Sequence, residues 1–455
     1  MKKFQLFTLL SIISIFASCD NDDDTTITTS PTVSSFTVTI ENIAAANDFI
    51  GSGVFNTPVG DSNPGPATPG KSYEFTFDAG RSHKLSFATM LAATNDLFFA
   101  PNGNGISLYD ENGDPFSGNV TDQVYLWDAG TEVNEEPAVG PNTVGNQAAA
   151  NTGVDENGNV LKIEDVTNGV AFNYPSVDEL INVTISHVEG TQFTVTIEDL
   201  ATASFSTSDG MKAAPLSPGV YVAHSGANPL FTEGEPDYDQ GVEAIAEDGN
   251  TEPLGVYTAS TTGVTYPSSP GVWVTHQEGT MPLFTANTPD YGLGLEHIAE
   301  DGDVTMLSDN LSTLEGQITS GVVNTPVGSS NPGPLLPGAS YEFTFSAEQG
   351  DNLSFATMLA ATNDVLFATG DSGIALFDAN GNAINGDITS MVSLWDAGTE
   401  VNEQPAIGPN TVTNQLAADT GVDENGNVQL LDQVNDGFDY PSVDSVLKIT
   451  ITSNL

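Results

Sequence analysis

The sequence predicts an all-β protein built from two tandem antiparallel β-sandwiches, with short helices confined to an inserted repeat. Two observations carry this prediction. Short runs that alternate apolar and polar residues are separated by turn-forming clusters, and 45 Gly and 26 Pro are spread over 455 residues. One long stretch of the chain also occurs twice. A chain of this length exceeds a single hydrophobic core, so at least two domains are expected.

The duplication is direct. Residues 53–160 recur as residues 321–428, and 74 of the 108 aligned positions are identical. The matched strings include SFATMLAATND, which closes a strand-like run, and LWDAGTE. Each copy is preceded, at some distance, by one run of sequence FTVTIE, at 36–41 for the first and 193–198 for the second. We therefore expect one sandwich over 34–190 and a second over 191–455, with a boundary near Gly190.

A smaller repeat lies between the two copies. The segment 217–250 recurs as 269–303, and each begins with SPGV and ends with IAEDG followed by one further residue. Apolar residues at helical spacing predict short helices near 240–247 and 292–300. Each segment is a strand, a loop and a helix that cannot bury itself alone. We expect the first segment to pack on the first core or to stack beside its sibling in an enlarged second domain.

The N-terminus has the pattern of an export signal. Two lysines precede an apolar run over 4–16, which is shorter than the roughly 20 residues of a membrane-spanning helix, and small residues lead to Cys19. We interpret 1–18 as a lipoprotein signal peptide and Cys19, the only cysteine, as the site of lipidation. The alternative is a lone cysteine at the end of a cleaved signal.

The residues after the cysteine are acidic and rich in threonine. Residues 20–24 read Asp-Asn-Asp-Asp-Asp, and we interpret 19–33 as a tether. An acidic tag at this place favours the outer face of a bacterial outer membrane. The same residues also suit a simple solvated spacer, and the two interpretations are compatible.

Charge excludes some partners. The chain has 61 acidic and 8 basic residues, a formal net charge of −53. Such a field repels phosphate backbones and anionic lipid surfaces, so nucleic-acid binding and electrostatic membrane binding are not expected. Contact with a membrane would run through the lipid anchor alone. Cations are the natural partners, although acidity also serves solubility.

Three strings, read together, resemble a known family. GVEAIAEDG or GLEHIAEDG, SFATMLAATND, and LWDAGTE are similar to blocks of the spondin N-terminal domain, found in proteins of the F-spondin and mindin type. The resemblance implies a C2-like antiparallel β-sandwich that binds one calcium ion between loops and has no enzymatic activity. It departs where the animal proteins carry a tryptophan after the first ligand, since Leu97 and Val365 stand here.

The resemblance also implies the calcium ligands. They are an acidic residue at the end of the strand block and two acidic residues, four apart, in the DAGTE block. Glutamate stands here where the family has a second aspartate in that block. The implied ligands are Asp96, Asp128 and Glu132 in the first copy, and Asp364, Asp396 and Glu400 in the second.

The chemistry of these residues agrees with calcium. Ca²⁺ takes six to eight hard oxygen ligands in irregular geometry, and grouped carboxylates without a cation repel one another. The alternative is that Asp96 and Asp128 cap turns while Glu132 is solvated. The strings that begin at Asp110 and Asp155 lack EF-hand spacing, and we interpret them as hairpin turns.

No enzyme is expected. Residues 370–373 read Gly-Asp-Ser-Gly, a serine-protease string, but the counterpart at 102–105 is Asn-Gly-Asn-Gly and no histidine pattern accompanies it. His224 and His276 lie at equivalent positions of the small repeat. Together with Trp273 they are candidates for contact with a partner, or else half-buried strand residues.

The expected function is therefore a calcium-binding, surface-anchored lipoprotein that mediates adhesion. Its partner would be an extracellular protein, a glycan or a matrix component, because tandem modules on one tether gain avidity. The alternatives are a surface protein that binds carbohydrate or another nutrient, and, third, an uncharacterised hydrolase.

Overall fold

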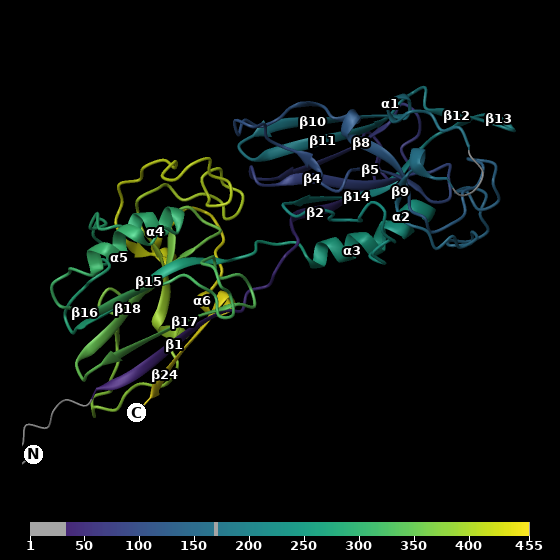
Figure 1. Cartoon of the computed structure of the whole chain (residues 1–455). Helices are drawn as coiled ribbons and strands as arrows, with labels where there is room; N and C mark the ends of the chain where they lie inside the picture. The colour runs from purple at the N-terminus through teal and green to yellow at the C-terminus, as the bar shows by residue number, and fades with distance from the viewer. Residues whose placement is uncertain (1–32, 168–171, 455) are drawn as a thin grey trace, which may run out of the picture.

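The computed structural model describes residues 33–167 and 172–454. It is mostly β, with 36% strand and 12% helix, in several antiparallel sheets of which none is closed. The all-β prediction is confirmed at this level. The strands and helices form two bodies, which we call the first and second modules (Figure 1).

Each module contains a large sheet. In the first module the strand order is β2-β14-β4-β5-β8-β9, with β6 paired to β4. The bounds are β2 Phe49–Phe55, β4 Lys84–Leu91, β5 Leu97–Pro101, β6 Ile106–Ser107, β8 Val124–Asp128, β9 Leu161–Lys162 and β14 Leu216–His224. The second module repeats the order as β16-β15-β18-β19-β22-β23, with β20 paired to β18. Its strands are β15 Ser268–Gln277, β16 Gln317–Val323, β18 Asp351–Leu359, β19 Val365–Thr369, β20 Ile374–Ala375, β22 Val392–Asp396 and β23 Gln429–Leu430.

A smaller sheet faces each large one. Its order is β3-β11-β10-β7 in the first module and β17-β1-β24-β21 in the second. The first comprises β3 Ser72–Asp78, β7 Gly118–Asn119, β10 Ile181–Glu189 and β11 Gln192–Asp199; the second comprises β1 Ser34–Asn42, β17 Ser340–Ala347, β21 Gly386–Asp387 and β24 Leu447–Asn454. Inward side chains of the two sheets share one core in each module. A separate hairpin, β12 Ser204–Thr207 with β13 Gly210–Ala213, extends the first module.

Helices cover the other face of each large sheet. α2 (Val242–Asp248) and α4 (Leu295–Asp301) lie where the sequence predicts helices, and each stops at a glycine in the left-handed region, Gly249 at φ 64° and Gly302 at φ 68°. Four further helices were not predicted from the sequence: α3 (Glu252–Ser260), α5 (Thr305–Leu311) and the short α1 (Val177–Leu180) and α6 (Val443–Val446). Four 3₁₀ turns complete the elements of residues 33–167 and 172–454: η1 Thr121–Gln123, η2 Ile163–Asp165, η3 Thr389–Met391 and η4 Leu431–Gln433.

The first strand–helix segment packs on the first core. Val242 and Ile245 are fully buried among residues of β4, β5 and β14, together with Trp127. This is one of the two arrangements that the sequence predicts for the segment 217–250. The second segment makes the equivalent contacts in the second module, where Leu295 and Ile298 pack against β18 and β19.

The two FTVTIE strands lie in the opposite modules to those expected from a boundary near Gly190. β11 pairs with β10 and β3 of the first module, and β1 pairs with β17 and β24 of the second (Figure 1). Both β3 and β17 contain YEFTF, so the strands themselves do not specify a partner. The tight turn at Gly190, with φ 54°, makes β10 and β11 a hairpin. β1 is therefore left for the second module, and the first module is inserted after it.

Among the described residues, hydrogen bonds join the modules at two places. One lies between the connecting segments, and the other between residues 81–82 and 409–414, where Ser82 N donates to Asn414 Oδ1 at 2.9 Å. The connecting segments lie side by side, and Asn47 donates from its main chain to Thr265 Oγ1 at 2.9 Å and from Nδ2 to the Val264 carbonyl at 3.1 Å. Arg81, the only arginine of the chain, donates from Nη1 to the Pro409 carbonyl at 2.7 Å. The same guanidinium donates from Nε to a carbonyl of its own module, at 3.1 Å. A charged side chain thus holds a loop of the second module against the first.

Candidate metal centre

The predicted aspartates meet at one end of each large sheet. Asp96 directly precedes β5 and Asp128 ends β8, and these strands are antiparallel neighbours with Leu97 opposite Asp128. In the second module Asp364 precedes β19 and Asp396 ends β22, in the same register. Register therefore brings two carboxylates to the same edge in each module, as the sequence predicts.

These four aspartates are buried. Asp96, Asp364 and Asp396 are 0% exposed and Asp128 is 2% exposed. Burial, and then the charge of the neighbouring aspartate, raises the pKa of Asp96 and of Asp364 well above the usual range. Burial is also the main cause that raises the pKa of Asp396 to about 6. Two buried carboxylates at one place are costly unless a proton or a cation neutralises them.

The turn after Asp128 depends on glycine. Asp128 Oδ1 accepts a hydrogen bond from Gly130 N at 2.6 Å, and Gly130 has φ 70°. A Cβ at this position would lie 2.6 Å from the carbonyl oxygen of Asn159. The glycine of the DAGTE block is therefore required both for the backbone angle and for the close approach of the 159 loop.

The glutamates of the DAGTE blocks serve a different contact. The carboxylate of Glu132 accepts hydrogen bonds from Asn95 Nδ2 at 3.1 Å and from Gly153 N at 2.7 Å, and only its main-chain N–H reaches Asp96 Oδ2, at 3.2 Å. Glu400 repeats the arrangement with Asn363 and Gly421. The structure thus uses these two predicted ligands to tie loops together beside the aspartates.

A different glutamate joins the aspartates. Ligand oxygens of Asp364, Asp396 and Glu424 all lie within 4.8 Å of one another. Glu424 belongs to the string Asp-Glu-Asn-Gly, whose first copy was interpreted as a hairpin turn. Its counterpart is Glu156, and burial and then the charge of Asp128 raise the pKa of Glu156. The acidic string carried the signal, but it lies too far along the chain for spacing to connect it with the aspartates.

Several buried acceptor oxygens at these sites have no donor. Among the described residues, Oδ1 of Asp96, Asp396, Asn134 and Asn402 has no hydrogen-bond partner. The two asparagines each donate from Nδ2 to the Oδ2 of an aspartate, Asn134 to Asp128 and Asn402 to Asp396. Their amide oxygens are therefore left for another donor or for a cation. Carboxylate and amide oxygens are the ligand types that calcium prefers.

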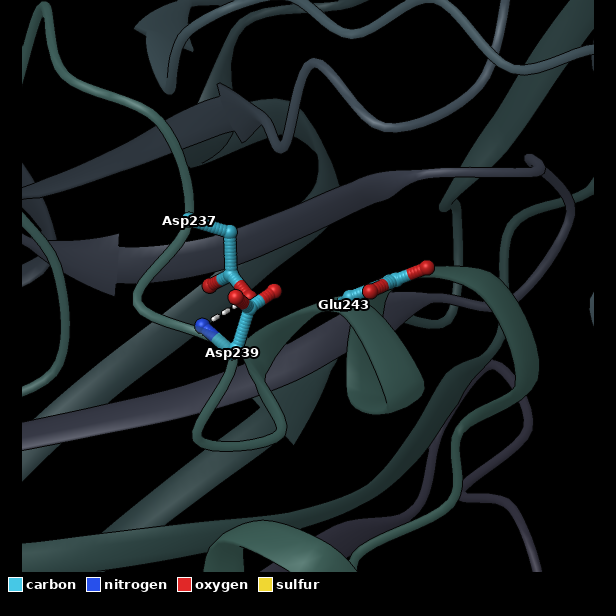
Figure 2. Close-up of side chains that lie close together, drawn as sticks. All are labelled: Asp237, Asp239 and Glu243. Carbon is cyan, nitrogen blue, oxygen red and sulfur yellow. Dashed lines mark hydrogen bonds between the residues drawn. The ribbon is translucent and has the colours of Figure 1, made fainter.

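A second kind of acidic group lies at the start of α2 in the first module. Asp237, Asp239 and Glu243 have oxygens within 4.8 Å of one another, and Asp239 N donates to Asp237 Oδ2 at 3.0 Å (Figure 2). Glu243 lies in the first turn of α2, beside the loop that carries the two aspartates. In the second module Gly292 stands at the place of Asp239, so this trio is not repeated.

The second module has its own helix-based group. Glu296 and Glu300 of α4 converge with Asp419, again within 4.8 Å. Glu300 is 2% exposed, and burial raises its pKa to about 8. In the first module Asn151 replaces Asp419, while Glu247 is equivalent to Glu300 and burial raises its pKa to about 7.

The candidate partner residues are inside the modules. His224 is 1% exposed and His276 0%, and each ring contacts a serine hydroxyl of the neighbouring strand at 2.9 Å, that of Ser86 and of Ser354 respectively. Trp273 is 8% exposed and stacks on Phe343, with ring centroids 5.2 Å apart. These side chains pack the sheets and present little surface to a partner.

The predicted signal peptide, Cys19 and the tether as far as residue 32 lie outside the described residues. Within residues 33–167 and 172–454, no helix has both the length and the apolar character needed to span a bilayer.

Two comparisons with known proteins found no relative. No protein-family model matches the chain, and a search of curated proteins found no similar sequence. The resemblance to the spondin N-terminal domain therefore stays a prediction.

Proposed function

We propose that the chain is a non-catalytic, calcium-binding surface protein whose two modules each hold one ion at the end of the large sheet. The ligands in the second module are Asp364, Asp396 and Glu424, with the amide oxygen of Asn402. Asp96, Asp128, Glu156 and Asn134 are the equivalent ligands in the first. We also propose that each module has a C2-like fold and is related to the spondin N-terminal domain.

One observation carries the proposal. Buried carboxylate and amide oxygens converge at the end of the sheet, and among the described residues four of them, Oδ1 of Asp96, Asn134, Asp396 and Asn402, accept no hydrogen bond. Such a set is unfavourable by itself, because buried polar groups normally find partners. A divalent cation would satisfy the oxygens and neutralise the repelling charges together.

Calorimetric titration of the chain with Ca²⁺ tests the proposal. We expect two binding events in the unmodified protein and one in the variant Asp396→Asn. Glu342→Gln, at an exposed position on β17, removes one charge without touching the site and should bind as the unmodified protein does. Glu424→Gln and Glu400→Gln separate the two ligand assignments, since only the first should weaken binding strongly. Absence of heat and of thermal stabilisation at millimolar Ca²⁺ would remove the proposal.

We propose further that the modules act outside the cell as an adhesion protein on a lipid anchor at Cys19. The net charge of −53 supports this, because it disfavours anionic partners and favours cation-dependent contacts. Radiolabelled palmitate should enter the unmodified chain and not Cys19→Ser. Protease added to intact cells should remove the modules if they face outward.

A carbohydrate-binding function has one observation in its favour. A groove of about 500 Å³ beside β22 and β23 is lined by Phe438 and Tyr440 among other residues. Trp273 is packed inside and could not serve as the sugar platform. A glycan array would decide this alternative, with Tyr440→Ala as the variant that should lose any signal.

A further inference from the structure

The two FTVTIE strands end in different residues at one buried position. β1 ends in Asn42 and β11 in Asp199, and both side chains are 0% exposed. The main chain is the same around both. The N–H of Asn42 donates to the Ala339 carbonyl at 2.9 Å, and its carbonyl accepts from Gly338 N at 2.8 Å. Asp199 makes the same two hydrogen bonds, at the same distances, with the equivalent residues Lys71 and Gly70. The asparagine and the aspartate therefore occupy the same place in their modules.

Asn42 is fully satisfied in the second module. Its Nδ2 donates to the carbonyl oxygens of Tyr266 and Leu335, both at 2.9 Å. Its Oδ1 accepts from Ala44 N at 3.0 Å. In the second module the side chain at this position thus donates to two carbonyl oxygens, of which that of Leu335 also accepts from Ser268 N at 3.1 Å.

Asp199 stands at the equivalent position of the first module, and an ionised aspartate has no side-chain donor. The residues equivalent to Tyr266 and Leu335 are Ala214 and Ala67. Ala67 pairs with Leu216 in the same way as Leu335 pairs with Ser268. Neither Asp199 Oδ1 nor Oδ2 has a hydrogen-bond partner among the described residues. A carboxylate facing carbonyl oxygens is repelled by them, whereas the O–H of a carboxylic acid can donate as the amide does.

The neighbouring groups do not provide the missing donor. The Tyr73 hydroxyl already donates to the Gly65 carbonyl at 2.7 Å. The ammonium of Lys71 forms an ion pair with Asp61 at 2.5 Å. Glu198 adds a negative charge beside the position.

We propose that Asp199 is a proton-binding residue: it stays a neutral acid at neutral pH, donates to the carbonyl oxygens that Asn42 serves in the other module, and makes the first module sensitive to alkali. Two causes, burial first and the charge of Glu198 second, raise the pKa of Asp199 to about 8. Because the pKa in the folded state is raised, the stabilisation is complete below the ordinary value of about 4 and is lost as the pH rises to about 8.

The reciprocal variants Asp199→Asn and Asn42→Asp test this inference in the full chain. Thermal unfolding is followed at pH 5, 7 and 9 in saturating Ca²⁺, so that the acidic groups at the end of the sheets keep one charge state. We expect Asp199→Asn to raise the first module's midpoint by several degrees at pH 9 and to change it little at pH 5. Asn42→Asp should transfer the alkaline loss of stability to the second module.

Two results would overturn the inference. A shift by Asp199→Asn that is equal at pH 5 and pH 9 would mean that no proton is held there. Alternatively, replacing Na⁺ with tetramethylammonium could destabilise the unmodified chain and leave Asp199→Asn unaffected, which would assign a small cation to the position instead. Asp199→Asn keeps the side-chain shape and copies Asn42, so the test stands even if Asn42→Asp does not fold.

Discussion

The two modules share the strings SFATMLAATND and LWDAGTE, yet they hold the first aspartate of the metal centre differently. Asp364 accepts hydrogen bonds from the main chain of Thr399 and Glu400 and from Thr399 Oγ1, at 2.8 to 3.1 Å. The side chain of Asp96 accepts one hydrogen bond, from Glu132 N to Oδ2 at 3.2 Å, and its Oδ1 has no partner among the described residues. On the calcium proposal, the first module should therefore depend more on a bound cation, although the local sequences are nearly identical.

The modules also differ beside the metal centre. In the first, Lys162 lies over the Tyr125 ring, 4.1 Å from its centroid, and the groove there measures about 260 Å³. In the second, Leu430 and Ser393 replace these residues and the groove is about 500 Å³. The second module thus combines the better satisfied aspartate with the larger groove.

Chelation of calcium should separate the modules most clearly. With EGTA we expect both unfolding transitions to move to lower temperature, and the first module to lose more, because Asp96 has fewer hydrogen bonds than Asp364. An ion at a hundred times its dissociation constant stabilises a fold by about 2.7 kcal/mol. Differential scanning calorimetry with and without Ca²⁺ measures both shifts. Equal losses in the two modules would show that the different hydrogen bonding of Asp96 and Asp364 does not affect their dependence on calcium.

The variant Arg81→Gln copies the residue found at the equivalent position, Gln349, and should loosen the contact between the modules. Hydrogen bonds from a charged donor contribute about 1.5 to 3 kcal/mol, and Gln cannot span the carbonyls that Arg81 reaches. Small-angle scattering should report a broader distribution of distances between the modules. The matched change Gln349→Arg should leave that distribution as it is.

Calcium affinity should rise with pH. Burial raises the pKa of Asp396 to about 6. Below that pH protons compete with the cation for this carboxylate, and above it the carboxylate is free of protons. For one proton released on binding, the affinity should increase about tenfold, or about 1.4 kcal/mol, for each pH unit below 6. Titrations at pH 5, 6 and 7.5 measure this. An affinity independent of pH would place the ion away from Asp396.

The smallest effect is expected from Thr399→Val. This change removes the hydroxyl that donates to Asp364 Oδ1 at 2.8 Å, and it should destabilise the second module without calcium by about 1 kcal/mol. Urea unfolding in EGTA gives the value, and Thr452→Val, at an exposed position on β24, is the control. If this change made the two modules equally sensitive to chelation, the Thr399 hydroxyl alone would account for the difference between them.

The sequence predicted the features that depend on local or repeated patterns. The duplication and the helices near 240–247 and 292–300 follow from repetition and spacing, and the resemblance to the spondin N-terminal domain implied that Asp96 meets Asp128. Each of these is decided by residues close in sequence or by one pair of neighbouring strands.

The missed features depend on choices between equivalent partners. Both FTVTIE strands fit both YEFTF strands, and only the tight turn at Gly190 decides which pair forms. Glu424 reaches Asp364 and Asp396 through folding of a long loop, whereas Glu400 is close in sequence but points its carboxylate at Gly421. Spacing along the chain could not distinguish these two glutamates.

The place of β1 has a mechanical consequence. The start of β1 lies beside the end of β24, with Ser35 opposite Asn454, so the two ends of the described chain leave the second module together (Figure 1). A pulling force between these ends would open the β1–β24 ladder one hydrogen bond at a time, as a zip opens, and would not stretch the first module until β1 is detached. The inserted module is thus shielded from tension by the strand that precedes it.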